Sequence, residues 1–400
     1  MNKKLGSLFL VSVIDILGFG ILIPLLPYMG ERFGASAQVI TPVLGAYSLC
    51  QLLSAPFWGA LSDAHGRRPI LMSSLAGACV SYAMLAFAHN IWWLLASRIL
   101  GGFMAGNIAA AFAYASDIST PQNRAASLGM VGAAIGVGFT LGPALGGILA
   151  GNDLHTANFA LPAIVSAFLS VLAIGVVAFI LPETRTAAER AHAAARRSSP
   201  LRLLTERPSL RFTAIAALLV TSSQAILESI FAIWALQRFG FGPRTAGLFM
   251  FCLAIFAVLT QGGLVRVLAP KLGEQKLATL GVSAYVVGLV VVAQAPNITV
   301  TALALALCGV GVGAFNPSAS ALASKQADEH DRGAVMGTYQ SSTSLARVIG
   351  PFVSGPVFQW LGPAAPFILG ACVALPAAWF VWRIRTTAPS LSQRSIPRGQ

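Results

Sequence analysis

The stretch Gly59-Ala-Leu-Ser-Asp63-Ala-His-Gly66-Arg67-Arg68-Pro69 lies between two long apolar segments. It combines an acid, two arginines and two glycines of the kind that end helices. A segment buried in lipid cannot carry that charge cheaply. The stretch therefore predicts a tight turn at a membrane surface, between two membrane-spanning helices.

The composition of the whole chain agrees with that prediction. Of 400 residues, 56% are hydrophobic and 10% are charged, whereas soluble domains carry about a quarter charged residues. A chain this apolar cannot cover its surface with polar groups, so it is an integral membrane protein. The net charge of +13 does not indicate nucleic-acid binding, because no basic patch is interleaved with aromatic residues.

Apolar stretches of about 20 residues mark the bilayer crossings. We expect an all-α integral membrane protein with twelve transmembrane helices near residues 6–29, 41–61, 69–89, 92–116, 127–150, 159–181, 211–235, 245–268, 277–295, 299–321, 333–357 and 363–385. Basic residues concentrate in the loops on one side, which by the positive-inside rule places both termini in the cytoplasm. The first apolar run lacks a small-residue cleavage site, and we interpret it as a retained helix.

The chain divides into two halves. An Ala-, Arg- and Ser-rich stretch over 182–210 predicts a cytoplasmic linker between an N-terminal six-helix bundle (1–181) and a C-terminal one (211–386). Residues 387–400 are expected to form a disordered cytoplasmic tail.

An internal repeat supports two pseudo-symmetric halves. Arg124, Gly129 and Gly142-Pro143 recur 208 residues later as Arg332, Gly337 and Gly350-Pro351. Transporters are often built from such parallel repeats, with the substrate path between them near mid-membrane.

Two acids fall well inside predicted spans, Asp15 and Glu228, out of thirteen in the chain. An isolated carboxylate in the membrane is costly and lowers that cost by binding a proton, which is the property a proton carrier needs. Asp15 lies about 13 Å along the first helix, near mid-membrane. We predict proton coupling for both acids; the alternative is a static acid paired with a neighbouring helix.

The cations inside the spans are Arg98 and Arg347. Arg98 reaches the depth of Asp15 and is predicted to pair with it when Asp15 is ionised. Arg347 lies in the middle of the eleventh helix and is the predicted partner of Glu228. The alternative for Arg98 is a static hydrogen-bonding post between helices.

Polar and aromatic groups inside the spans are the candidate substrate contacts. They are Gln51, Asn107, Gln224, Phe231, Trp234, Gln261, Phe315 and Asn316. The alternative for the aromatic members is packing against lipid or other helices. At the membrane surface, Asp63 is suited to capping the N-terminus of a facing helix, and Arg67 is predicted to pair with Asp117.

Five segments together resemble the twelve-helix drug:proton antiporter branch of the major facilitator superfamily. They are Asp15-Ile-Leu-Gly18-Phe-Gly20 continuing to Pro24 and Pro27, the Gly59–Pro69 stretch, Leu94-x-x-x-Arg98-x-x-x-Gly102, Ala113-Tyr-Ala-Ser-Asp117 continuing to Asn123-Arg124, and Gly138-x-x-x-Gly142-Pro143-x-x-Gly146-Gly147. Within the branch, Tyr47-x-x-x-Gln51-x-x-x-Ala55-Pro56 is similar to bacterial tetracycline and multidrug efflux antiporters. Two departures stand out, because Ser81 and Tyr285 occupy positions where the tetracycline antiporters have acids.

The resemblance implies a proton-coupled exporter of lipophilic small molecules in the bacterial inner membrane, working by alternating access as a monomer. It implies no enzyme activity and no cofactor or metal, and it makes Gln51 a substrate contact. It assigns a gating role to Gly59, Asp63, Gly66, Arg67, Arg68, Asp117 and Arg124, and an antiporter motif, which limits leak, to Gly138, Gly142, Pro143, Gly146 and Gly147. The alternative is a carrier of the same fold that exports or co-transports a metabolite such as a sugar or amino acid.

Overall fold

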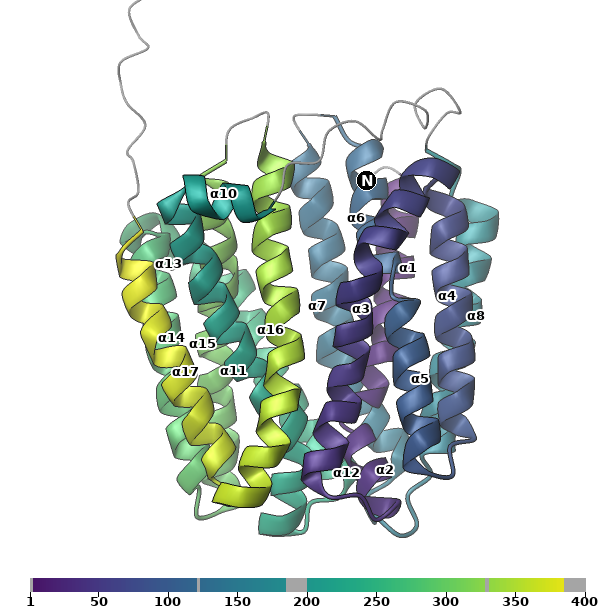
Figure 1. The fold of residues 1–400 in the computed structure, drawn as a ribbon, viewed down its shortest axis with the longest axis vertical. Helices are drawn as coiled ribbons and strands as arrows, with labels where there is room; N and C mark the ends of the chain where they lie inside the picture. Colours follow the sequence, from purple (N-terminus) through teal and green to yellow (C-terminus); the bar gives the residue numbers. More distant parts are fainter. Residues whose placement is uncertain (1–2, 121–122, 185–199, 328–330, 385–400) are drawn as a thin grey trace, which may run out of the picture.

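The computed structural model describes residues 3–120, 123–184, 200–327 and 331–384, and the regular structure in these residues is helical (Figure 1). The first group of helices is α1 (Lys3–Leu22), α2 (Leu26–Arg32), α3 (Ala37–His65), α4 (Arg67–Ala86), α5 (Ile91–Phe103), α6 (Asn107–Asp117), α7 (Arg124–Ala150) and α8 (Ala160–Ile180). The second group is α10 (Pro200–Glu206), α11 (Pro208–Phe239), α12 (Pro243–Leu259), η2 (Thr260–Leu264), α13 (Val265–Leu272), α14 (Glu274–Gln294), α15 (Ile298–Ser324), α16 (Arg332–Leu361) and α17 (Ala365–Trp382).

The chain is a multi-pass membrane protein. In the part that the structure describes, eleven helical segments are long and apolar enough to cross a bilayer. The one other expected span, the eleventh (333–357), is α16, which has the length but carries the polar run Gln340–Ser344 and Arg347. α16 packs against α11 and α3, and of these polar residues Gln340 and Ser341 are exposed while the others are partly buried.

Three expected spans are interrupted in the structure. The first is α1 plus α2, broken next to Pro24; the fourth is α5 plus α6; the eighth is α12, the π-helical turn η2 and α13. Proline removes a backbone donor, and π-turns mark irregular points in helices. Hydropathy alone shows the length of an apolar run but not these breaks.

The two groups of helices form two bundles that lie side by side, α1–α8 on one side and α10–α17 on the other (Figure 1). Their principal contacts with each other are α3 against α16 and α7 against α12. The N-terminus, the α3–α4 turn, α10 and the last turn of α17 lie at one end. Within the expected linker, α10 packs on α11 and α16; most of that linker and the expected tail lie outside the described residues.

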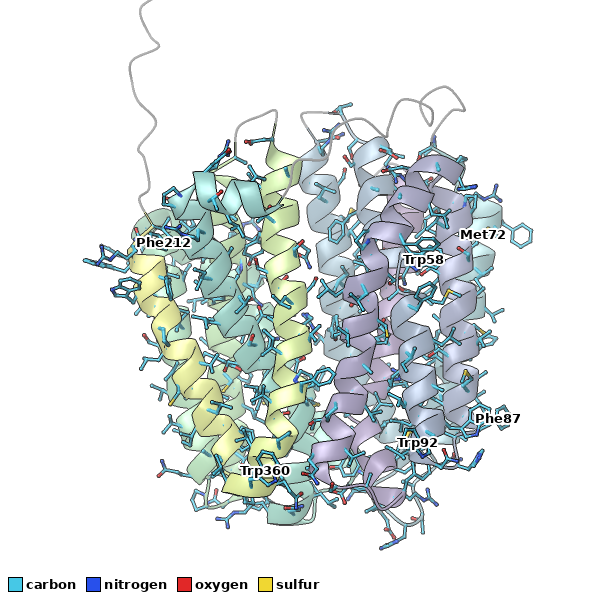
Figure 2. All side chains as sticks on the ribbon, viewed as in Figure 1. Trp58, Met72, Phe87, Trp92, Phe212 and Trp360 are labelled. Carbon is cyan, nitrogen blue, oxygen red and sulfur yellow. The ribbon has the colours of Figure 1, made fainter. Side chains whose placement is uncertain are left out.

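At the opposite end, hereafter the closed end, the two bundles touch closely. A Cβ on Gly355 of α16 would overlap the Thr41 hydroxyl and the Ala37 carbonyl of α3. The Arg244 amide donates to the Gly151 carbonyl at 3.0 Å. Figure 2 shows the side chains that fill each bundle and the approach of the two bundles near Trp360.

At the end that carries the N-terminus, hereafter the open end, glycines of the same four helices face empty space. Among the described residues, no atom outside their own helix lies within 4 Å of the Cβ position of Gly59 in α3, Gly132 in α7, Gly262 in η2 or Gly337 in α16. Figure 1 shows α3 and α16, which touch at the closed end, diverging toward the open end.

This asymmetry predicts different outcomes for the same substitution at two points of α16. We expect Gly355→Leu to force α3 and α16 apart and to destabilise the protein by about 1–3 kcal/mol, as overpacking does. Gly337→Leu adds the same side chain where there is space and is expected to leave stability unchanged. Thermal unfolding of both variants in detergent checks this; equal melting temperatures would contradict the close contact at Gly355.

Candidate functional site

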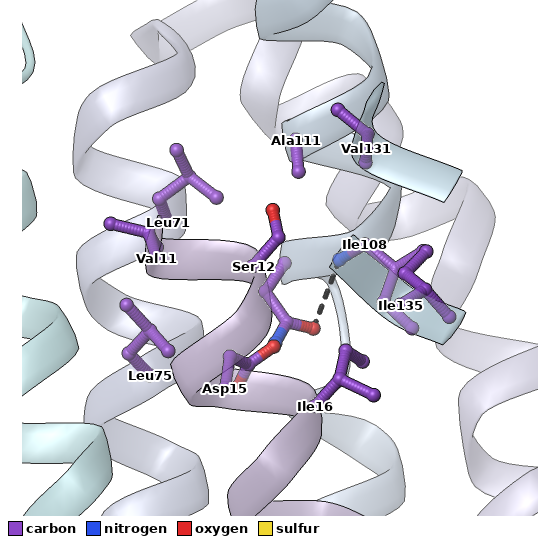
Figure 3. Close-up of a pocket in the computed structure, with 11 residues that line it drawn as sticks. Val11, Ser12, Asp15, Ile16, Leu71, Leu75, Ile108, Ala111, Val131 and Ile135 are labelled. Atoms are coloured by element: carbon purple, nitrogen blue, oxygen red, sulfur yellow. Dashed lines mark hydrogen bonds between the residues drawn. The ribbon is translucent and has the colours of Figure 1, made fainter. Parts of the chain in front are cut away.

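Asp15 of α1 is buried and is held by Asn107, the first residue of α6 (Figure 3). The Asn107 side-chain carbonyl accepts a hydrogen bond from the Ile108 amide at 3.0 Å, so its amino group faces Asp15 and donates to Oδ2. The first turn of a helix carries partial positive charge. The carboxylate thus has two sources of stabilisation, an amide donor and a helix N-terminus.

The break between α5 and α6 is fixed by side chains from two neighbouring helices. The Ser74 hydroxyl of α4 donates to the Met104 carbonyl and accepts from the Asn107 amide at 2.9 Å. Trp58 of α3 donates to the Phe103 carbonyl and covers Gly106, where a Cβ would lie 2.5 Å from the indole ring. The break is therefore built into the packing, and it places Asn107 beside Asp15.

A narrow pocket reaches Asp15 from within the N-terminal bundle (Figure 3). Residues of four helices line it: Val11, Ser12, Asp15 and Ile16 of α1, Leu71 and Leu75 of α4, Asn107, Ile108 and Ala111 of α6, and Val131 and Ile135 of α7. The Ser12 hydroxyl is buried without a hydrogen-bond partner in the described part of the chain. The free space suits a water molecule and is too small for an organic ligand.

Arg98 does not pair with Asp15, so this prediction is wrong for the conformation observed. The guanidinium lies 5.7 Å from the centre of the Tyr47 ring, and Nη2 donates to the Ser81 hydroxyl at 3.5 Å. Its Nε has no hydrogen-bond partner among the described residues. Asp15 instead has Asn107 as its hydrogen-bond partner, and Arg98 has the Ser81 hydroxyl.

The predicted Glu228–Arg347 pair is also absent from the described contacts. Glu228 accepts a hydrogen bond from Gln224, one turn earlier on α11, at 2.9 Å. Arg347 instead points across to the other bundle, where its guanidinium lies 5.7 Å from the centre of the Phe139 ring of α7. Both groups thus have neutral partners in place of each other.

Three aromatic rings connect the two arginines. Phe139 lies 5.8 Å from Phe19, and Phe19 lies 4.7 Å from Tyr47, between ring centres. We call Tyr47, Phe19 and Phe139 the aromatic row; all three are partly exposed. The row was not predicted from the sequence, although Phe19 and Tyr47 lie inside two of the motifs given above.

The candidate substrate contacts differ in how far they are buried. Gln51, Gln224 and Asn316 are partly exposed, Gln261 is exposed in η2, and Asn107 is buried at Asp15. Phe231, Trp234 and Phe315 are fully buried, so here they are core residues. Phe231 and Trp234 pack on each other, with Phe249 and Phe367 beside them, while Phe315 packs in the C-terminal bundle.

The Gly59–Pro69 stretch forms the α3–α4 turn at the open end. Arg67 makes the expected pair with Asp117, with 3.0 Å between Nε and Oδ2, and a second pair with Asp63 at 2.8 Å. Glu183, which follows α8 in the chain, lies against the start of α4. Its carboxylate accepts hydrogen bonds from the Arg67 and Arg68 backbone amides at 3.0 and 3.1 Å. Asp63, expected to cap a facing helix, is here paired with Arg67.

The rest of this turn depends on Glu183 and α8. Gly66 has φ +103°, which favours glycine, and a Cβ there would overlap the Glu183 carboxylate. The Arg68 side chain donates to the carbonyls of Val177 and Ala178 at the end of α8. Arg124, also expected in the gate, is exposed at the start of α7.

The glycine-rich face of α7 lies in two close interfaces. Cβ atoms on Gly138, Gly142 and Gly146 would overlap residues 16–21 of α1, and one on Gly147 would overlap Pro243 and Arg244. The Pro143 carbonyl lies against Gly247 of α12. This face therefore joins α7 to α1 within one bundle and to α12 of the other.

Comparison with known proteins agrees with this geometry. The sequence profile of the Major Facilitator Superfamily matches residues 8–307 and 262–400. The class C tetracycline resistance protein of Escherichia coli is 31% identical over 94% of this chain and 96% of its own length. Mouse major facilitator superfamily domain-containing protein 10 is 28% identical over 95% of this chain and 92% of its own.

Solved structures extend the likeness to the fold. The crystal structure of the human organic anion transporter MFSD10 (TETRAN) superposes with a TM-score of 0.74 and 26% identity, covering 95% of this chain and 99% of that one. The nucleoside transporter NupG superposes with a TM-score of 0.74 at 15% identity, covering 97% and 100%, and shares the fold.

The Glu183 contacts generate a prediction for the stability of the α3–α4 turn. Glu183→Ala leaves the first amides of α4 without their acceptor and is expected to destabilise the protein by about 0.5–2 kcal/mol. The control is Glu274→Gln, which removes a more exposed ion pair with Lys325 and is expected to cost less. Thermal unfolding of both variants tests this; a smaller loss for Glu183→Ala than for the control would contradict it.

Proposed function

We propose that this chain, which belongs to the major facilitator superfamily of membrane transporters, exports lipophilic small molecules in exchange for protons. The observation that carries the proposal is Asp15, a carboxylate buried within the first span, beside a helix break and lining a water-sized pocket. Intramembrane acids of this kind serve proton relays and ion coupling.

The chemistry at Asp15 supports reversible proton binding. When Asp15 is ionised, the Asn107 amide and the α6 N-terminus stabilise it. When it binds a proton, the charge that they stabilise is gone, and the link between α1 and α6 weakens. Asn107 is the first residue after the α5–α6 break. Proton binding at Asp15 therefore weakens a contact that holds the two parts of the fourth span, α5 and α6, in their present arrangement.

The space between the bundles supports a lipophilic substrate. The aromatic row and the partly exposed amides of Gln51, Gln224 and Asn316 combine apolar surface with a few polar groups, as binding sites for organic molecules do. Relatives named tetracycline resistance proteins and one described as an organic anion transporter are consistent with that substrate range.

Alternating access is supported by the glycines of α3, α7, η2 and α16. Those at the closed end pack tightly, and those at the open end face space. We propose that the open-end glycines pack in the opposite state, with the closed end parted. In that state Asp63 leaves Arg67 for the N-terminus of a helix in the other bundle, and the Arg67–Asp117 pair holds the gate.

The orientation follows from charge. We propose a bacterial inner-membrane protein whose open end and both termini are cytoplasmic, since the basic loops belong there. The halves correspond to residues 1–181 and 211–386, joined by a linker over 182–210, and the protein works as a monomer. Drug then enters from the cytoplasm in the state observed here.

The experiment that tests this function is proton-coupled flux in inside-out membrane vesicles. With an imposed proton gradient, addition of a transported compound is expected to release protons, and Asp15→Asn is expected to abolish that release because an amide cannot exchange a proton. Asn107→Ala removes a donor that favours the ionised carboxylate, so exchange is expected to persist with its pH dependence moved to higher pH.

The control is Glu274→Gln, the same kind of acid-to-amide change at the pair with Lys325, away from Asp15 and from the proposed substrate site. Compound-dependent proton release that continues unchanged in Asp15→Asn would contradict the proposed coupling. Movement of sugars or amino acids, with no response to lipophilic drugs, would replace drug export by metabolite transport on the same fold.

A further inference from the structure

We infer that the site between the bundles binds organic anions that carry a planar apolar group, with the anionic group on Arg347 and the planar group on the aromatic row. This inference rests on the proposed export function and names its substrate class. It is carried by the positions of the charged groups and of the three rings.

The first observation is the lack of an acid for either arginine. Neither Arg347 nor Arg98 forms an ion pair with a described residue; their recorded neighbours are the rings of Phe139 and Tyr47 and the Ser81 hydroxyl. A guanidinium deep in a membrane protein is costly unless an anion compensates it. Arg347 is partly exposed and is therefore accessible to an anion from solution.

The second observation is that both acids have other partners. Asp15 is held by Asn107, and Glu228 by Gln224. Two arginines against two carboxylates give these four groups a net charge of zero when both acids are ionised and +2 when both bind protons. The net charge of these four groups is zero or positive, so electrostatics favours an anionic over a cationic substrate once either acid binds a proton.

The third observation is the geometry around Arg347. Its guanidinium lies 5.7 Å from the centre of the Phe139 ring, and the row continues through Phe19 to Tyr47. Gly136, nearly one turn before Phe139 on α7, faces open space. A planar group stacks on such rings, and a carboxylate or sulfonate at its edge reaches the forked donors of the arginine.

The position also links the two bundles. Arg347 belongs to α16 and the aromatic row to α1, α3 and α7. A ligand that bridges them contacts both halves at once, and its anionic group replaces part of the cation–π contact that Arg347 now makes across the gap. In this arrangement Arg347 of the C-terminal half binds the anionic group, and the aromatic row of the N-terminal half binds the planar group.

Two probes that share one ring system and differ in charge test the inference. Equilibrium dialysis of the purified full-length protein would use naphthalene-2-sulfonate and the matched cation naphthalen-2-ylmethylammonium. We expect the sulfonate to bind more tightly than the ammonium probe. Arg347→Gln is expected to weaken sulfonate binding at least tenfold without weakening the ammonium probe, because the neutral amide removes an attraction for one and a repulsion for the other.

Companion variants separate charge from packing. Arg347→Lys keeps the charge but loses the fork and is expected to give intermediate sulfonate affinity, whereas Phe139→Leu is expected to weaken both probes. Arg383→Gln is the matched control, since Arg383 also lies over an aromatic ring, that of Trp379 at 4.8 Å, at the end of α17. It is expected to leave both probes unchanged.

Tighter binding of the ammonium probe, or unchanged sulfonate binding in Arg347→Gln, would overturn the inference. If Arg347→Gln does not yield folded protein, the same comparison with Arg347→Lys and Phe139→Leu decides. Proton-coupled transport of cations at the same rate in Arg347→Gln as in the unchanged protein would overturn the anion site and leave the export proposal standing. Sulfonate binding that needs Arg347, in a protein that never exchanges protons, would overturn the export proposal alone.

Discussion

The cost of holding a carboxylate inside a membrane is the constraint on which the site depends. Asp15 is buried in α1, and the protein meets its charge with a side-chain amide and a helix N-terminus rather than with a cation. That arrangement depends on the break in the fourth span, which places Asn107 beside Asp15. The break in turn requires Ser74 and Trp58 on neighbouring helices to satisfy the backbone groups that it frees.

The same constraint accounts for the arrangement of the two arginines. A carboxylate satisfied by Asn107 does not need Arg98, and Ser81 offers Arg98 a hydroxyl in place of a charge. Aromatic faces then become the neighbours of both guanidiniums. Two weakly compensated cations beside a row of partly exposed rings give the space between the bundles its chemical character.

Much of the fold follows from the sequence, because it depends on averages over about 20 residues. Spans, turn positions and the two-half organisation are set by hydropathy and by a repeat at an offset of 208 residues. The Arg67–Asp117 pair was also predictable, since two short motifs at the same membrane surface carry opposite charges. Breaks such as that before Asn107 were not, because they depend on single hydrogen bonds from other helices.

The charge pairs inside the membrane show where reasoning from sequence fails. Asp15 and Arg98 are expected at one depth, and Glu228 and Arg347 both lie inside expected spans, which suggests pairing in each case. The structure gives each acid an amide neighbour instead, Asn107 from another helix and Gln224 from the previous turn. Which face of a helix a residue occupies, and what its nearest neighbour offers, are properties of packing. Glu183 was missed for the same reason, since it meets α4 only in three dimensions.

The central claim is that proton binding at Asp15 shifts the two bundles between states open on opposite sides. Pulsed electron–electron resonance tests it most directly, with spin labels at Arg124 and Lys271 for the open end and at Val39 and Trp360 for the closed end, in a protein whose five cysteines are replaced. The account predicts that a change of pH alters the two distances in opposite directions, and that Asp15→Asn removes this response. Distances that change together, or that respond to pH equally well without Asp15, would contradict it.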